Sequence, residues 1–207
     1  LLTGDPTVYS GDFVSPEQII PPGGIADVNG DWVPWEACIT MNNSWGYNST
    51  DHQWKSSKQI VRKLVECVSK RGNLLLNVGP TSRGEIPEPS LRVLSEIGEW
   101  MEKNGPSVRG CGPSSLGKPE WGYLTQNGDR IFAHLFDGNF GPTAIDIPKE
   151  KVKVVRMLAD GSELQPIESW ATSLWADRLF VNFGPDPVGS YPLPDDVDTV
   201  VEIELTE

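Results

Sequence analysis

The sequence predicts an α/β fold in its first half and an all-β fold in its second half. Two apolar runs that are typical of strands, at residues 35–41 and 73–78, alternate with two segments of helical periodicity, at 57–70 and 88–103. Beyond residue 105 the pattern changes to short alternating segments separated by turn residues. The first pattern favours parallel strands with crossover helices, and the second favours an antiparallel β-sandwich.

The stretch 35–47 contains the first predicted strand and the loop that follows it. An apolar run with polar interruptions predicts the strand, and its carboxyl end opens onto Asn42, Asn43 and the run Ser44-Trp45-Gly46-Tyr47. Loops after strands commonly carry binding residues on a rigid support. An aromatic ring covers the C–H face of a sugar while amides reach its hydroxyls, so this loop suits a sugar. A strand end with a core Trp and an ordinary turn is the alternative.

The two predicted helices are recognised by apolar residues three and four positions apart. Ser56 or Ser57 fits the cap of the first helix, at 57–70, and the second helix covers about 88–103. Between them, residues 73–78 form a continuous apolar run that is typical of a fully buried strand. Two strand–helix units cannot close a barrel or finish a sheet, so we expect them to be the last part of a larger domain.

The second half is predicted to be a series of short strands. They lie at 123–125, 130–136, 143–147, 152–158, 179–183 and 199–205. Asn127-Gly128-Asp129 and Asp160-Gly161-Ser162 are turn signals between them. Gly and Pro cluster at 106–118, which predicts a linker between a domain at 1–105 and a sandwich domain at 119–207.

Composition and charge argue against several classes of partner. The net charge is −12, and the chain has no long basic cluster, so it lacks the basic face that nucleic acid requires. No apolar run approaches the roughly 20 residues that span a bilayer, so no membrane partner is expected. Cys38, Cys67 and Cys111 are too widely spaced for a disulfide framework or a zinc site. Because His52 and His134 also lack a ligand pattern, we expect no metal and no cofactor.

Residues 1–34 are rich in Gly, Pro, Asp and Ser and show little periodicity. A loop of this length is usually functional or disordered. Ser15 and Pro16 fit the cap and the first position of a helix, so Glu17 fits a first helical turn. The chain starts with neither Met nor a signal-peptide pattern, and we therefore expect a fragment or a processed piece.

Three motifs in the first half occur in the order and spacing of a known family. They are Trp35-Glu36-x-Cys38-x-Thr40-x-Asn42-x-Ser44-Trp45-Gly46-Tyr47, Gly72-Asn73-Leu74-Leu75-Leu76-Asn77-Val78-Gly79-Pro80 and Gly84-x-Ile86-Pro87. Together they resemble the alpha-L-fucosidases of glycoside hydrolase family 29. Gly11-Asp12-Phe13-x-x-Pro16-Glu17 resembles the active-site loop that precedes them. The resemblance covers residues 11–105, and the second half matches only in kind, because this family carries a C-terminal β-sandwich.

The resemblance implies a catalytic (β/α)8-like barrel, of which residues 1–105 would be the last strands and helices. It also implies a retaining exo-glycosidase that removes terminal alpha-L-fucose, with one carboxyl group as nucleophile and another as acid and base. The family's nucleophilic Asp lies on an earlier strand, outside this chain. The implied partners are therefore a fucosylated glycan and the remaining N-terminal part of the catalytic domain. Linkage preference, aglycone, oligomeric state and compartment (secreted, periplasmic or lysosomal-type) stay open.

Glu17 and Glu36 compete for the role of the catalytic acid. Barrel enzymes keep catalytic residues at the carboxyl ends of strands and in the loops that follow. Glu36 lies at the amino end of its strand, and at about 3.3 Å per residue it falls well below Trp45. Glu17, on a loop that leads back into the barrel, is therefore preferred. A buried carboxylate paired with an Arg or with strand-end amides is the alternative for Glu36.

Trp45 has the clearest role by resemblance, which is to pack against the C6 methyl group of fucose. An apolar wall rewards that methyl group and penalises the hydroxyl that other hexoses carry there. Asn43 and Tyr47 are the other predicted substrate-binding residues. Asn42-x-Ser44 and Asn48-x-Thr50 match the N-glycosylation pattern, although Asn42 is expected to be too buried for modification.

A non-catalytic carbohydrate-binding module is the alternative function. In that case the sandwich is the working part, and Trp121, Trp170 and Trp175 form its aromatic platform. A sandwich that only packs, without any ligand, is the third possibility.

Overall fold

The structure, a computed structural model, describes residues 12–206 and divides the chain into two compact units, Leu1–Met101 and Glu102–Glu207. The first unit alternates strands and helices, and the second is built almost entirely of strands. No helix within residues 12–206 has both the length and the apolar character needed to cross a bilayer.

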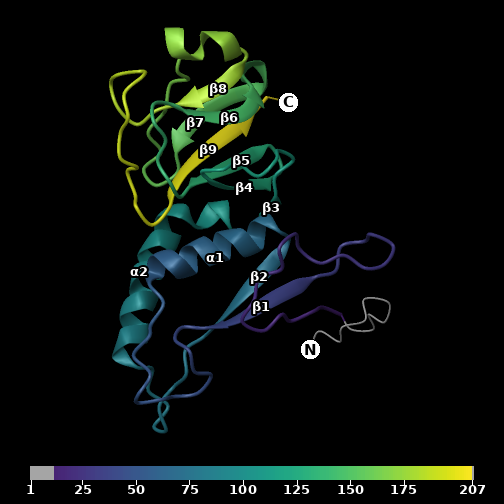
Figure 1. Cartoon of the computed structure of the whole chain (residues 1–207), viewed down its shortest axis with the longest axis vertical. Helices are drawn as coiled ribbons and strands as arrows, with labels where there is room; N and C mark the ends of the chain where they lie inside the picture. Colours follow the sequence, from purple (N-terminus) through teal and green to yellow (C-terminus); the bar gives the residue numbers. More distant parts are fainter. Residues whose placement is uncertain (1–11, 207) are drawn as a thin grey trace. The chain divides into compact units, whose positions relative to one another are not determined.

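The first unit is organised around two parallel strands (Figure 1). β1 (Trp35–Thr40) and β2 (Gly72–Asn77) pair in parallel, which confirms the predicted strands and their direction. The crossover between them is α1 (Ser57–Ser69), close to its predicted bounds. Its cap is Ser56, whose hydroxyl accepts a hydrogen bond from the backbone N–H of Gln59 in a reciprocal capping box.

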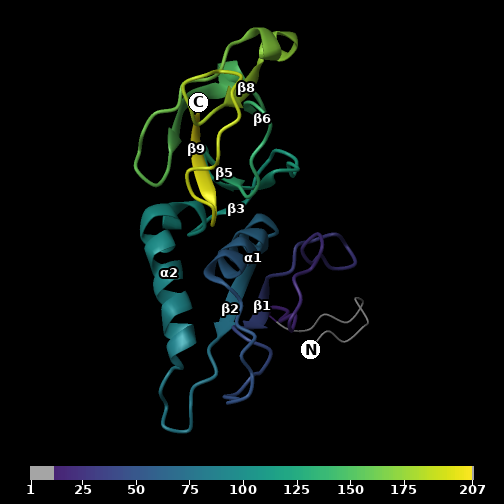
Figure 2. The same ribbon diagram turned by 60° about the vertical axis from the view of Figure 1, so that its left-hand side comes forward.

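α2 (Glu88–Asn104) confirms the second predicted helix. Apolar residues of both helices pack against the sheet. Figure 2 shows the two helices on one side of β1 and β2. One cluster there joins Trp35 and Ala37 of β1 to Cys67 of α1, and a second joins Ile60 of α1 to Val93 of α2. Cys67 is a core residue, and burial raises the pKa of its thiol to about 12.

The alternative of a helical turn at Ser15-Pro16-Glu17 is wrong, because this segment is extended. Val14 and Glu17 form parallel bridges with Trp35 and Cys38 of β1. The N–H of Cys38 donates to the Pro16 carbonyl at 2.9 Å, and the N–H of Gln18 donates to the Cys38 carbonyl at 2.9 Å. Residues 14–18 therefore continue the parallel sheet on the free edge of β1, and cross-strand hydrogen bonds outweigh the local capping signal. Gly11, at the start of this motif, lies outside the described residues.

The second unit contains two antiparallel sheets. Its strands are β3 (Gly112–Pro113), β4 (Gly122–Asn127), β5 (Arg130–Leu135), β6 (Thr143–Pro148), β7 (Val152–Met157), β8 (Arg178–Val181) and β9 (Thr199–Leu205). Short 3₁₀ turns lie at η1 (Gly105–Ser107), η2 (Lys149–Lys151) and η3 (Trp170–Trp175). One sheet has the order β3-β4-β5-β9-β7, and β6 pairs with β8 in the other. All six predicted strands of this half are thus confirmed.

The two sheets of the second unit share one apolar core. Ile145 of β6 and Leu179 of β8 belong to the same buried cluster as Ile131 of β5 and Val201 of β9. Alternating apolar residues on each strand produce this arrangement, because successive side chains point to opposite faces. The predicted Asn-Gly-Asp turn connects β4 to β5, with Gly128 at a φ of 60°.

A fully buried polar network lies in the larger sheet around His134. Its Nδ1 lies 2.7 Å from Asp198 Oδ2, and its Nε2 lies 3.1 Å from the hydroxyl of Thr125. That hydroxyl donates to the Ser107 carbonyl at 2.6 Å. Since a hydroxyl has one proton, Thr125 must accept its second hydrogen bond from His134 Nε2. His134 therefore has a structural role in its strand.

Candidate active site

The β1–β2 sheet has one packed face and one open face. Side chains alternate along a strand, so Ile39 and Leu74 point to the helices while Glu36, Cys38 and Leu75 point the other way. On this second face Leu75 is 49% exposed, and Glu36 and Cys38 are half-buried. We call the two faces the helix face and the open face.

Both candidate carboxylates belong to the open face. Glu17 is the bridge partner of Cys38, and bridged residues of parallel strands point the same way. Glu36 is two positions before Cys38, so it shares that direction. Burial and then the charges of Glu17 and Glu36 raise the pKa of the Cys38 thiol, which is consistent with this grouping. The structure thus brings together two residues that are 19 positions apart in the sequence.

Glu17 and Glu36 differ in position and in exposure. Glu17 pairs with Cys38, which lies two residues after Glu36 along β1. At a rise of about 3.3 Å per residue, Glu17 lies about 7 Å further toward the carboxyl end of the sheet than Glu36. The Glu17 side chain is exposed, whereas Glu36 is half-buried. Within residues 12–206, neither carboxylate forms an ion pair, so the expected alternative of an Arg partner for Glu36 is not found there.

The loop after β1 presents its aromatic side chains to solvent. Trp45 is 41% exposed, and Tyr47 and Asn43 are also exposed. Among the described residues Trp45 is therefore not a core residue, contrary to the alternative stated above. Asn42 is buried, as predicted, and its side-chain oxygen accepts from the N–H of Ser44 at 3.1 Å.

Two charged residues that sequence reasoning missed hold this loop. Asp51 accepts hydrogen bonds from the N–H of Asn43 at 2.9 Å and from the hydroxyl of Ser44 at 2.8 Å. The Lys55 ammonium donates to the carbonyls of Thr40 at 2.7 Å and Asn42 at 2.8 Å, and burial lowers its pKa. An Asp at a turn is a weak sequence signal for the hydrogen bonds of Asp51. No sequence pattern indicates the hydrogen bonds of Lys55.

The loop that follows β2 lies at the same end of the sheet as the loop that follows β1 (Figure 1). The side-chain amide of Asn77, the last residue of β2, donates to the Trp45 carbonyl at 2.7 Å. Gly79 has a φ of 55°, and an added Cβ there would lie 3.3 Å from the Gly46 carbonyl group. Glycine is therefore suited to this close approach of the two loops.

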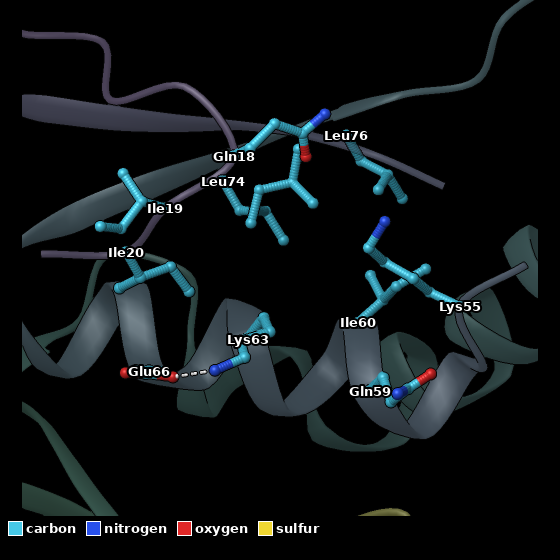
Figure 3. Close-up of a pocket in the computed structure, with 11 residues that line it drawn as sticks. Gln18, Ile19, Ile20, Lys55, Gln59, Ile60, Lys63, Glu66, Leu74 and Leu76 are labelled. Atoms are coloured by element: carbon cyan, nitrogen blue, oxygen red, sulfur yellow. Dashed lines mark hydrogen bonds and ion pairs between the residues drawn. The ribbon is translucent and has the colours of Figure 1, made fainter. Parts of the chain in front are cut away.

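A groove of about 410 Å³ lies on the helix face, away from the candidate carboxylates (Figure 3). Its floor is formed by apolar residues of the sheet, including Ile39, Leu74 and Leu76, and α1 forms its other wall. Lys63 and Glu66 of α1 form an ion pair of 2.7 Å at its edge. Because Ile39 and Glu36 point to opposite faces of β1, this groove is separate from the candidate active site.

The proposed aromatic platform of the second unit is only partly available. Trp121 is 8% exposed, and its indole N–H donates to the Ala144 carbonyl at 3.1 Å, so its inclusion in the platform is wrong. It fills the core because the strands around it bring its ring between the sheets. Trp170 is 82% exposed and Trp175 is also exposed. His52 is exposed in its loop, and residues 12–206 contain no group of His, Cys, Asp and Glu side chains suited to a metal ion.

The first unit thus combines two carboxylates on one face of a parallel sheet with an exposed aromatic loop after β1. The family model described as alpha-L-fucosidase matches residues 3–106, half of the chain, and the chain belongs to this family. Alpha-L-fucosidase isoenzyme 1 from Paenibacillus thiaminolyticus is 50% identical with a TM-score of 0.90, covering 96% of this chain and 46% of that one.

Curated relatives carry the same family name. The alpha-L-fucosidase of Dictyostelium discoideum is 39% identical over 50% of this chain and 23% of its own length. The tissue alpha-L-fucosidase of Mus musculus is 31% identical over 68% of this chain and 34% of its own length. The chain therefore spans between 23% and 34% of the length of these two relatives. A fucosidase from Bacteroides thetaiotaomicron, 23% identical with a TM-score of 0.74, shares the fold.

Proposed function

We propose that this chain is part of a retaining exo-glycosidase that removes terminal alpha-L-fucose from oligosaccharides or glycoconjugates. The observation that carries the proposal is the joint placement of Glu17 and Glu36 on the open face, with Trp45 exposed at the carboxyl end of the sheet. Family membership supports the choice of fucose among sugars. The Bacteroides thetaiotaomicron fucosidase has been trapped as a covalent intermediate with 2-fluoro-fucosyl fluoride, and this supports retention of configuration.

In the proposed architecture, residues 1–105 supply the last strands and helices of a (β/α)8-like barrel. Residues 106–118 link this part to a β-sandwich at 119–207. The remaining N-terminal part of the protein covers the open face and supplies the nucleophilic Asp. The parallel pairing of β1 and β2 supports this arrangement, because parallel sheets occur almost only with both faces covered.

In the proposed reaction, Glu17 is the acid and base. It protonates the leaving oxygen as the glycosyl-enzyme forms, and then it activates the water that releases fucose. Its position nearer the carboxyl end of the sheet favours it over Glu36, since barrel enzymes bind substrate at that end. Glu36, half-buried and deeper, is the second candidate.

The substrate-binding part of the proposal assigns Trp45, Tyr47 and Asn43 to the sugar. The Trp45 ring contacts the C6 methyl group, and exposure of the ring at the loop surface supports this. An apolar contact of that size discriminates by about 10- to 200-fold against a substrate with a hydroxymethyl group there. Tyr47 and Asn43, exposed on the same loop, would donate hydrogen bonds to ring hydroxyls.

The test measures hydrolysis of aryl alpha-L-fucosides by the full-length polypeptide that carries this chain. Glu17→Gln should slow substrates with poor leaving groups by about 10²- to 10⁴-fold, while substrates with good leaving groups lose much less at the glycosylation step. Glu36→Gln is run in parallel, and Glu96→Gln, exposed on α2, is the matched control. If Glu36→Gln alone shows the leaving-group dependence, the acid is Glu36. Absence of any fucoside hydrolysis in the parent enzyme would refute the function itself.

A sugar-binding role of the second unit is a second candidate, favoured by one observation. Trp175 lines an open depression of about 480 Å³ together with Phe180 and with Arg178, which forms a 2.7 Å ion pair with Asp146. An aromatic ring beside charged hydrogen-bonding groups suits a pyranose. Calorimetry with fucosylated oligosaccharides on the parent enzyme and on Trp175→Ala tests this role. Equal heats from the two proteins would rule it out.

A further inference from the structure

The loop that carries Trp45 is fixed at its main chain from two directions. From β2, the amide of Asn77 donates to the Trp45 carbonyl at 2.7 Å, across 32 positions of sequence. Asn77 is the register partner of Thr40, the last residue of β1, so this contact joins the carboxyl ends of the two strands. It links the aromatic loop directly to the rigid part of the sheet.

The second hold comes from Asp51, further along the same connection. One of its carboxylate oxygens accepts from the N–H of Asn43 and the hydroxyl of Ser44, at 2.9 and 2.8 Å. The other oxygen accepts from the N–H of Gln53 at 3.1 Å, which orients the carboxylate. Asp51 therefore fixes the two residues that immediately precede Trp45, and Asn77 fixes Trp45 itself.

We propose that Asn77 and Asp51 are positioning residues, which set the place of the Trp45 ring against the sugar without touching the sugar. This inference rests on the proposed contact between Trp45 and the C6 methyl group. It goes beyond that contact because it makes the substrate specificity of the Trp45 ring depend on two polar residues that do not touch the sugar. An exposed loop with an aromatic side chain has several accessible conformations, and these hydrogen bonds select one of them.

The geometry explains why a positioning role is favoured over direct binding. Asn77 donates one of its two amide N–H groups to the Trp45 carbonyl, and Asp51 uses both of its oxygens on backbone and hydroxyl donors. Hydrogen bonds to a charged acceptor are stronger than neutral ones, so Asp51 is suited to hold a tight turn. Asp51 is half-buried in its loop, and the hydrogen bonds from Gln53 and Ser44 lower its pKa.

The experiment compares an aryl alpha-L-fucoside with the corresponding alpha-L-galactoside, which differs only by a hydroxyl at C6. In the full-length enzyme, Asn77→Ala should raise KM for the fucoside about tenfold, with a smaller change in kcat. It should also reduce the preference for the fucoside by a similar factor, because a displaced ring no longer distinguishes methyl from hydroxymethyl. Asp51→Ala should act in the same direction. A general loss of stability would not change this substrate ratio.

A double-mutant cycle with Trp45→Ala separates positioning from direct contact. If Asn77 acts through the ring, Asn77→Ala should change the substrate ratio less than twofold once Trp45 is Ala. If Asn77→Ala costs the same in both backgrounds, Asn77 binds the sugar directly and the positioning role is overturned. If Trp45→Ala leaves KM and the substrate ratio unchanged, the proposed sugar contact of Trp45 is itself wrong, and the positioning role is wrong with it.

Matched controls are available for both residues. Asn182 also donates its amide to main-chain carbonyls, those of Asp186 and Gly189 at 3.0 Å, but in the second unit. Asp27 accepts from the N–H groups of Asn29 and Asp31 in the loop before β1, at the opposite end of that strand from Trp45. Asn182→Ala and Asp27→Ala should leave the substrate ratio unchanged. Asn77→Asp, which keeps the shape but loses the donor, should reproduce Asn77→Ala and provides a second variant if Asn77→Ala fails to fold.

Discussion

The His134 network of the second unit and the two candidate carboxylates of the first unit are polar groups in opposite environments. In the second unit, His134, Asp198 and Thr125 are fully buried and hydrogen-bonded to one another. In the first unit, Glu17 and Glu36 lie on an open face and form no ion pair within residues 12–206. Buried polar groups must satisfy one another, whereas polar groups on an open face are available to a ligand.

This difference in environment separates polar residues with a structural role from polar residues that a ligand can reach. The sheet that contains β5 shares its core with a second sheet, and its buried polar residues form a closed hydrogen-bonded network around His134. A parallel sheet with helices on one face leaves the other face for a further layer or for substrate. We therefore expect substitutions in the second unit to change stability and substitutions on the open face to change activity.

The largest expected effect tests this distinction at Asp198. Asp198→Ala removes the partner of a fully buried His134 and should lower the free energy of unfolding of its unit by about 3–5 kcal/mol. Glu36→Ala should change it by no more than about 0.5 kcal/mol, as for a site outside any network. Denaturant unfolding of the full-length protein measures both. A loss of stability for Glu36→Ala as large as that for Asp198→Ala would remove the distinction.

Much of the fold was predictable because periodicity is a local property. The apolar spacing in 57–69 and 88–104 defines the two helices, and alternation defines the strands of the second unit. The pairing of segment 14–18 was not predictable, because Ser-Pro-Glu carries a helix-start signal while its actual partners, Trp35 and Cys38, lie 21 positions away. Only long-range hydrogen bonds fix its extended form.

The sequence names candidate site residues, but it does not define how they are arranged. The motif resemblance names Glu17, Glu36 and Trp45, and sequence spacing places Glu36 below Trp45. That Glu17 is level with Cys38, on the same face as Glu36, depends on the register between two segments, which no local pattern encodes. The hydrogen bonds that Asp51 and Asn77 form with the Trp45 loop likewise depend on the conformation of that loop.

The next effect concerns the helix face of the β1–β2 sheet. A Cβ added at Gly72 would lie 2.3 Å from the Trp35 ring, which packs across this position. Gly72→Ala should therefore destabilise the protein by about 1–3 kcal/mol through overpacking. Gly98→Ala is the matched control, because nothing lies within 4 Å of its added Cβ, and in a helix it should stabilise by about 0.5–1 kcal/mol. Thermal unfolding should show a lower Tm for Gly72→Ala and a higher Tm for Gly98→Ala.

A smaller effect concerns the reactivity of Cys38 on the open face. Burial and the charges of Glu17 and Glu36 raise the pKa of this thiol, so Glu36→Gln should lower it toward its usual value. The pH at which iodoacetamide reacts at half its maximal rate should fall, as followed by mass spectrometry of the Cys38 peptide. Cys67, with a pKa of about 12, is the unreactive internal reference. An unchanged profile in both Glu17→Gln and Glu36→Gln would mean that the carboxylates do not share a face with Cys38.

The smallest expected effect is a pH dependence of the loop that carries Trp45. Hydrogen bonds from Gln53 and Ser44 hold the pKa of Asp51 below its ordinary value of 3.8. A carboxylate whose folded pKa is lowered stabilises the fold above its unfolded pKa, and this contribution is lost as the pH falls through the folded pKa. Protection of the Asn43 and Gln53 amides from hydrogen exchange should therefore decrease below about pH 4. The Met41 amide, which donates to the Asn77 carbonyl at 3.0 Å, should show no such step. A common step in all three amides would indicate unfolding of the whole unit, and the local role of Asp51 would then be wrong.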